Sequence, residues 1–114
     1  MRGFTMKIIA LIAISLFFTS TFSARAADAK ANWANNCAQC HGQSGNADTK
    51  MGKILNAKNL TDPAVQSSFT DAQAADAIKD GVKEGGKVKM KAFGDKLSSD
   101  EIKALVAYVR TLKK

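Results

Sequence analysis

The sequence contains the stretch Cys37-Ala38-Gln39-Cys40-His41, in which two residues separate two cysteines and a histidine follows directly. Side chains three positions apart at a helix end lie on one face, so both thiols can bond a single flat partner. The adjacent histidine can turn its ring towards the same partner. The chain has two cysteines and one histidine in all, so any site that needs these residue types must be built here.

Several kinds of site use this cysteine spacing. A zinc site would need further cysteine or histidine ligands, and the chain has none. A thioredoxin-like motif lies beside a βαβ pattern, which is absent, and a plain disulfide leaves the histidine unexplained. Cys-x-x-Cys-His is the attachment signature of a c-type haem. We therefore expect one haem c bound covalently through Cys37 and Cys40, with His41 as an axial ligand of its iron.

The second axial ligand cannot be another histidine of this chain. Met90 lies in a lysine-rich segment before the last predicted helix, and Met51 lies closer to the motif. A lone methionine more often fills a gap in a core, but Lys89 and Lys91 argue against simple burial of Met90. We predict that Met90 binds the iron. Met51, another ligand or an open position are the alternatives.

The N-terminus has the pattern of a secretory signal. Arg2 and Lys7 flank the start of an apolar run over residues 8–18, and Ala24-Arg25-Ala26 is a small-x-small cleavage pattern. An uncleaved anchor is the alternative, but the run is well short of the roughly 20 apolar residues that span a bilayer. We predict a signal peptide over residues 1–26, export to the periplasm, and a mature domain over residues 27–114 without a membrane span.

Removal of the signal changes the composition on which folding depends. The full chain of 114 residues has a formal net charge of +7, and three of its basic residues and four of its six phenylalanines lie in the signal. The remaining aromatic residues are Trp33, Phe69, Phe93 and Tyr108. A small domain with so few large side chains is marginal without a staple such as a bound cofactor. A haem at the centre would supply that staple.

Local signals predict several short helices. The expected helices are 28–36, leading into Cys37; 63–67, opened by Asp62-Pro63; one from the capping box Thr70-x-x-Gln73 to Gly81; and the amphipathic 99–112, opened by the capping box Ser98-x-x-Glu101. Residues 42–60 and 81–96 are expected to be loops, and no segment alternates like a strand. The predicted class is all-α, with three to five short helices around one covalently attached haem.

Several segments, taken in their order along the chain, resemble the small class I cytochromes c, and the resemblance covers nearly all of residues 28–114. The matching segments are Trp33, Cys37 to Gly42, Met90 to Phe93, Leu97 to Ile102 and Tyr108 to Arg110. The resemblance implies the cytochrome c fold and electron carriage rather than enzyme catalysis. It also implies thioethers at Cys37 and Cys40, and iron ligation by His41 and Met90.

Two departures from the family pattern bear on the expected site. Ala29 stands where glycine is common at the crossing of the first and last helices. The loop from Gly42 to Leu60 has no proline, although in the family a proline carbonyl there holds the proximal histidine. Another carbonyl must therefore accept the ring N–H of His41.

Six lysines lie around Met90 in the sequence: Lys79, Lys83, Lys87, Lys89, Lys91 and Lys96. We expect a positive rim that steers redox partner proteins with acidic docking patches, and a merely solvated loop is the alternative. Glu84 and Asp95 interrupt the run and no aromatic residues alternate with it, so nucleic acid is not an expected partner.

The predicted function is that of a periplasmic, monomeric, one-electron carrier whose iron cycles between Fe(II) and Fe(III). A ligand-binding or sensor haem protein with a displaceable sixth ligand is the alternative. A haem enzyme such as a peroxidase would need distal acid–base residues, which a chain with its single histidine on the iron hardly supplies.

Overall fold

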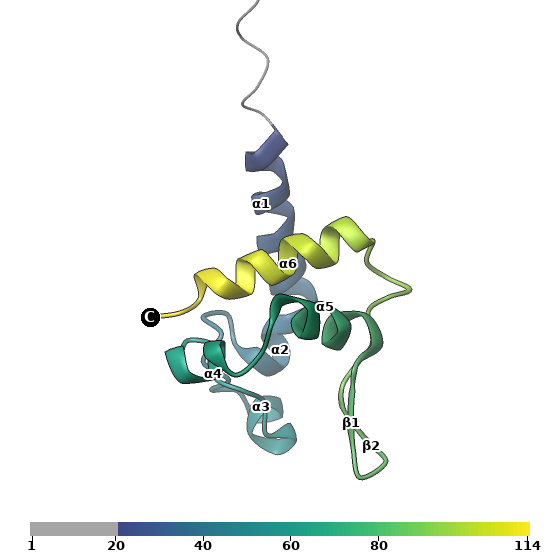
Figure 1. Ribbon diagram of the computed structural model, residues 1–114. Helices are drawn as coiled ribbons and strands as arrows, with labels where there is room; N and C mark the ends of the chain where they lie inside the picture. The colour runs from purple at the N-terminus through teal and green to yellow at the C-terminus, as the bar shows by residue number, and fades with distance from the viewer. Residues whose placement is uncertain (1–20) are drawn as a thin grey trace, which may run out of the picture.

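The computed structural model describes residues 21–114, so most of the predicted signal, residues 1–20, lies outside the described part. Its elements are α1 (Thr21–Asn32), a π-helix (Trp33–Cys37), α2 (Ala38–His41), α3 (Lys50–Leu55), α4 (Pro63–Ser67), α5 (Asp71–Asp80), β1 (Val82–Glu84), β2 (Lys87–Met90) and α6 (Ser99–Thr111). The described chain is mainly helical, which confirms the predicted class (Figure 1). The predicted cleavage point after Ala26 falls within α1.

The helices with strong N-terminal signals form where the sequence predicts them. Asp62 accepts a hydrogen bond from the Ala64 amide and caps α4, whose first residue is proline. Complete capping boxes at Thr70 and Ser98 open α5 and α6. α5 ends before Gly81, whose φ of 77° lies in the left-handed region.

The helix predicted over residues 28–36 is longer in the structure, where α1 starts at Thr21. It then continues without a break into the π-helix, where the amide of Ala38 bonds to the carbonyl of Trp33. Both ends of this wider turn, Trp33 and Cys37, are buried. Single π-turns are rare and occur mostly at functional sites.

Two segments that were expected to be loops contain regular structure. α3 lies within residues 42–60. Thr49 caps its start, where the Thr49 hydroxyl accepts from the Gly52 amide, and Asn56 follows its last residue in the left-handed conformation. The sequence did not predict α3 because glycine, here Gly52, disfavours a helix. The expectation that no segment forms a strand is wrong, since β1 and β2 pair antiparallel around Gly85-Gly86.

The hairpin turn has a simple physical cause. Gly85 and Gly86 have φ values of 57° and 78°, and two consecutive positive φ values are what a tight type I′ turn requires. Glu84 and Lys87, on either side, form the closing pair of the ladder. The sequence did not predict the hairpin because its strands have only three and four residues, too few for their alternation to stand out, and both are mostly exposed.

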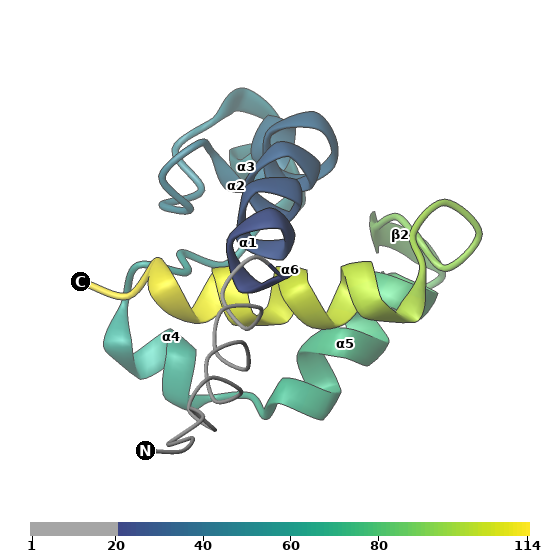
Figure 2. The same ribbon diagram turned by 90° about the horizontal axis from the view of Figure 1, so that it is seen from above.

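An apolar cluster between the π-helix, α5 and α6 forms the core of the described chain, and α1 crosses α6 beside it (Figure 2). Its buried members are Trp33, Cys37, Leu60, Ile78, Leu97, Ile102, Leu105, Val106 and Val109. Ala29 is also buried, on the part of the chain predicted to form the helix crossing. No helix within residues 21–114 combines the length and the apolar character needed to cross a membrane.

One buried polar side chain, Gln66, ties α4 to the end of α6. Its amide nitrogen donates to the carbonyls of Leu60 (2.7 Å) and Val109 (2.8 Å), and its oxygen accepts from Arg110 (2.9 Å). The Arg110 guanidinium also donates to the carbonyl of Phe69 and lies over the Phe69 ring. The bond to Leu60 satisfies a carbonyl that has no other hydrogen-bond partner among the described residues, whereas the Val109 carbonyl also accepts from the Leu112 amide.

We expect Gln66→Leu to lower the free energy of unfolding by about 2 kcal/mol, because it leaves the buried Leu60 carbonyl without a donor and removes one acceptor of Arg110. Unfolding in guanidinium chloride, followed by far-UV circular dichroism, measures the change. Gln43→Leu is the matched control, since Gln43 is exposed and the same substitution there should have little effect. Equal destabilisation by both variants would contradict this role for Gln66.

Candidate functional site

The turn that carries the Cys-x-x-Cys-His motif lies in the interior of the domain. Cys37 is buried within the apolar cluster, Cys40 and His41 are half-buried, and both cysteines are free thiols. Burial, with a smaller effect of Cys40, raises the pKa of the Cys37 thiol to about 11. Cys37 is therefore a neutral thiol at physiological pH, as its apolar surroundings require.

α3 locks the backbone of this turn. The Thr49 hydroxyl donates to the Cys40 carbonyl (2.7 Å) and accepts from the Gly52 amide (2.8 Å). The Ala47 amide donates to the carbonyl of His41 (2.8 Å). A Cβ at Gly52 would collide with the backbone carbonyls of Cys40 and Ala47. Glycine is required there because α3 approaches the motif so closely.

Trp33 fixes the other side of the turn. Its indole N–H donates to the carbonyl of Gly42 at 3.1 Å, directly after the histidine. The Trp33 ring lies 5.7 Å from the His41 ring and 5.6 Å from the Tyr108 ring, measured between centroids. An aromatic row therefore runs from α6 to the motif, and the His41 imidazole packs against its inner end.

His41 has the properties of a metal ligand. Burial lowers its pKa, so the neutral imidazole that binds metals is favoured near neutral pH. Its Nδ1 atom is buried without a hydrogen-bond partner. The backbone of Lys58 acts on the ring and partly offsets the fall in pKa, although no hydrogen bond of good geometry reaches Nδ1. Lys58 lies in the proline-free loop, where sequence reasoning could not name an acceptor.

Met90 approaches the same interior from a distant part of the chain. It ends β2, is half-buried, and packs against the cluster that contains Cys37. Met51, in α3, is more exposed (37%) and lies outside that cluster. The structure thus brings Met90, but not Met51, into the apolar cluster of the motif.

The end of α5 holds the Met90 segment in place. The amides of Phe93 and Gly94 donate to the carbonyls of Ile78 (2.8 Å) and Lys79 (3.0 Å). Gly81 lies against the segment, and a Cβ there would be 2.6 Å from the Met90 carbonyl oxygen. Its φ of 77° also disfavours any other residue. The placement of Met90 therefore depends on Gly81.

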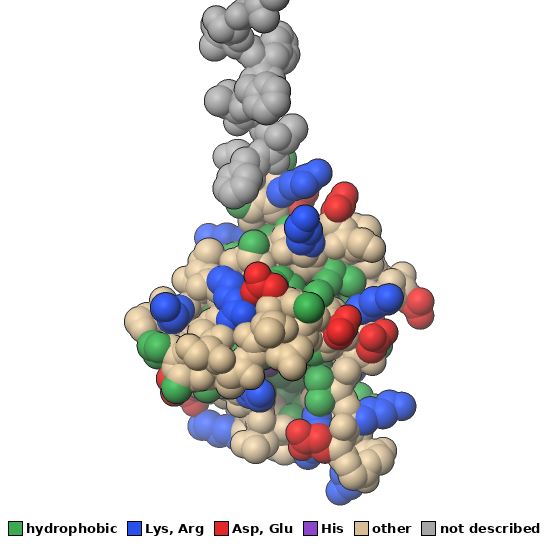
Figure 3. Space-filling model, viewed as in Figure 1, with side chains coloured by type: hydrophobic (Ala, Val, Ile, Leu, Met, Phe, Trp, Pro, Cys, Tyr) green, Lys and Arg blue, Asp and Glu red, His purple; other side chains and the backbone are tan. Residues whose placement is uncertain are grey.

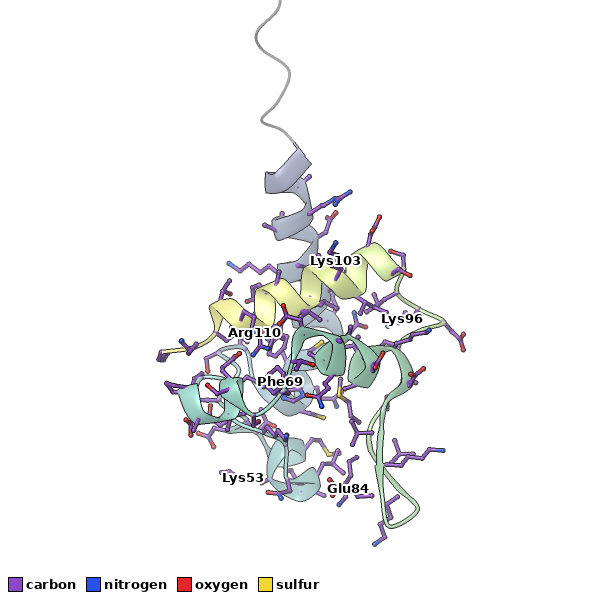
Figure 4. All side chains as sticks on the ribbon, viewed as in Figure 1. Lys53, Phe69, Glu84, Lys96, Lys103 and Arg110 are labelled. Atoms are coloured by element: carbon purple, nitrogen blue, oxygen red, sulfur yellow. The ribbon has the colours of Figure 1, made fainter. Side chains whose placement is uncertain are left out.

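These groups fit a covalently bound haem. The free thiol of Cys37 lies in the apolar cluster, the Met90 thioether packs against that cluster, and the His41 ring lies beside Trp33, a member of it. Figure 3 shows a hollow with hydrophobic side chains between the hairpin and the helices, and in the view of Figure 4 the sulfur atoms lie between α5 and α3. Residues 21–114 contain no group of three or more His, Cys, Asp or Glu side chains that could hold a metal ion instead.

Comparison with known proteins agrees with this chemistry. Residues 24–109 match the family described as cytochrome c oxidase, cbb3-type, subunit III. The chain is 40% identical over 80 residues to the cbb3-type cytochrome c oxidase subunit FixP of Azorhizobium caulinodans. That match covers 70% of this chain and 25% of the relative, so the chain spans about a quarter of the length of FixP.

Solved structures of c-type cytochromes share the fold. The KustC0563 c-type cytochrome is 34% identical and superimposes with a TM-score of 0.69, covering 76% of this chain and 99% of its own. A single-residue mutant of the same cytochrome gives a TM-score of 0.66 with 75% and 99% coverage. The chain therefore belongs to the cbb3-type subunit III family, and it is a c-type cytochrome with covalently bound haem c, the class of protein that carries electrons.

Proposed function

We propose that this cytochrome is an exported, monomeric one-electron carrier, with its haem attached through Cys37 and Cys40 and its iron bound by His41 and Met90. The main support is that Cys37 and Met90, from distant parts of the chain, pack in one apolar cluster. His41 lies on the turn that follows Cys37, with its ring beside Trp33 of the same cluster.

Each residue has a distinct role in this proposal. Cys37 and Cys40 would hold the haem through thioethers, and His41 and Met90 would be the ligands of its iron. When bound, the haem would supply a reversible Fe(II)/Fe(III) couple, whose reduction potential a Met thioether ligand would raise. The apolar cluster that contains Cys37 would keep water away from this site.

The cellular context forms part of the same proposal. The signal-like pattern of residues 1–26 supports export to the periplasm, where c-type cytochromes can meet other exported redox proteins. FixP is a subunit of a cbb3-type oxidase, which supports a redox protein as the partner. We infer that acidic patches on that partner recognise lysines of this cytochrome.

Methionine ligation predicts a specific optical signal. The oxidised protein should show a weak absorption band at about 695 nm, which is typical of a thioether ligand on Fe(III). Met90→Ala should abolish this band because it removes the ligand. Absorption spectroscopy of the purified oxidised holoprotein measures the effect.

Met51→Ala is the control and should keep the band. Survival of the band in Met90→Ala would show that another group is the ligand. Rapid binding of carbon monoxide to the reduced wild type would indicate an open or easily displaced sixth position, and would favour the ligand-binding alternative over the electron carrier.

The contact between Gly81 and the Met90 carbonyl gives a second prediction. Gly81→Ala should push the Met90 segment away and weaken the absorption band at about 695 nm. Gly85→Ala is a matched control, because its φ is also positive but nothing lies within 4 Å of the new Cβ. Equal spectra for the two variants would show that Gly81 does not position Met90.

Processing of the signal can be tested on the exported protein. The mature chain should begin at Ala27, and Ala26→Leu should block cleavage because the signal peptidase site requires a small residue there. Ala27→Leu should leave cleavage largely intact. Intact-mass spectrometry of periplasmic protein measures both, and a mature chain that retains residues 1–26 would refute the predicted signal.

A further inference from the structure

Asn36, directly before Cys37, bonds back onto the helix that leads into the motif. Its side-chain amide nitrogen donates to the carbonyl of Asn32 at 3.0 Å, four residues earlier. In an α-helix that carbonyl accepts from the backbone amide of residue 36 itself. A side chain that competes for a backbone carbonyl in this way disfavours the regular helical bond. The bond therefore favours the wider π-turn over Trp33–Cys37, in which the Ala38 amide bonds five residues back.

The oxygen of the same side-chain amide has no such use. Asn36 Oδ1 is buried and has no hydrogen-bond partner among the described residues. The amide group cannot be turned over, because its oxygen would then face the carbonyl oxygen of Asn32. A buried acceptor without a donor destabilises a fold, and an apolar side chain would avoid that cost. What asparagine supplies at this position is therefore its N–H donor to the π-turn.

Asn32 connects this turn to the start of α6. Its side-chain amide donates to Oε2 of Glu101 at 3.0 Å, and this is the one side-chain hydrogen bond between α1 and α6 in residues 21–114. α1 crosses α6 in Figure 2, and a hollow of about 180 Å³ lies beside the bond, lined in part by both residues. The bond therefore links the two helices at a point where their packing is incomplete.

Glu101 is held on its other side by the cap of α6. Its Oε1 accepts from the Ser98 amide at 3.1 Å, within the capping box. The hydrogen bonds from Ser98 and from Asn32 lower the pKa of Glu101, so the carboxylate is ionised at neutral pH and both of its oxygens accept. A row of hydrogen bonds therefore runs from the first turn of α6 through Asn32 to the side chain of Asn36.

The two cysteines of the motif have separate supports. The Cys40 carbonyl is held from α3 by the Thr49 hydroxyl at 2.7 Å. Cys37 instead ends the π-turn that Asn36 holds. A change in the width of that turn would rotate Cys37 relative to α1, because each residue of an α-helix adds about 100°.

We propose that Asn36 is a positioning residue for the haem. Together with Asn32 and Glu101 it keeps the π-turn wide, and the π-turn sets the direction of the Cys37 side chain that bears the haem. This inference rests on the proposed attachment of haem through Cys37. It makes the start of α6, far from the motif in the sequence, one of the elements that position the haem.

Paramagnetic NMR of the oxidised holoprotein tests this role, because the haem-methyl signals depend on how the haem and its axial ligands are oriented. Asn36→Leu removes the donor and keeps a side chain of similar size, so these signals should move. Asn35→Leu is the matched control, since Asn35 lies in the same turn but is exposed, and the signals should stay in place. Gln66→Leu controls for stability, because it should lower the free energy of unfolding without moving the signals.

Glu101→Gln breaks the link to α6 but keeps the helix cap, and it provides the test if Asn36→Leu does not fold. The glutamine oxygen can still accept from the Ser98 amide, whereas the glutamine amide group would face the N–H donor of Asn32. The haem-methyl signals should again move. Because both residues act through one row of bonds, the double variant should move them no further than Asn36→Leu alone.

Haem-methyl signals that stay in place in Asn36→Leu or in Glu101→Gln would overturn the proposal. So would signals that move equally in Asn35→Leu or Gln66→Leu, or two shifts that add fully in the double variant. Mass spectrometry of the same samples separates this inference from the proposed function. A haem-free peptide containing Cys37 and Cys40 in the wild type would refute the proposed attachment, whereas a haem-bearing peptide with unmoved signals refutes only the role of Asn36.

Discussion

The structure depends on one short turn that carries two thiols and an imidazole and whose carbonyls are held by neighbouring groups. The Thr49 hydroxyl donates to the Cys40 carbonyl and the Trp33 indole donates to the Gly42 carbonyl, while Gly52 lets α3 approach the Cys40 carbonyl closely. A buried carbonyl without a donor would cost about as much as several ordinary contacts contribute. The π-turn leads directly into this turn at Cys37, and the cap of α3 bonds to its Cys40 carbonyl.

Burial has different consequences for the three groups of the motif and for Met90. It keeps the Cys37 thiol protonated and the His41 imidazole neutral, so the site carries no charge of its own in the core. It also places the Met90 thioether among apolar neighbours, while α5 and Gly81 hold the backbone of the Met90 segment. The domain has few large side chains, and a central haem would replace much of the missing core.

Elements with local signals could be predicted from the sequence, and elements with tertiary causes could not. The caps at Asp62, Thr70 and Ser98 act within one helical turn, so α4, α5 and α6 were found with nearly correct ends. α3 could not be predicted because Gly52 is required by the nearby Cys40 carbonyl, and only the fold brings these two residues together. The hairpin could not be predicted, although Gly85-Gly86 is a strong turn signal, because its strands have only three and four residues. The prediction of His41, Cys37 and Met90 as site residues needed only the motif and residue counts, whereas the Lys58 backbone beside the His41 ring required the structure.

The central claim is that Cys37 and Cys40 hold the haem covalently on the turn that ends in His41. Tandem mass spectrometry of a proteolytic digest of the denatured holoprotein tests it most directly. The account predicts that the peptide containing both cysteines carries the mass of one haem after unfolding. It also predicts that Cys37→Ala or Cys40→Ala leaves a single thioether on the remaining cysteine. A denatured chain without the haem mass, or a haem on any other peptide, would contradict the account.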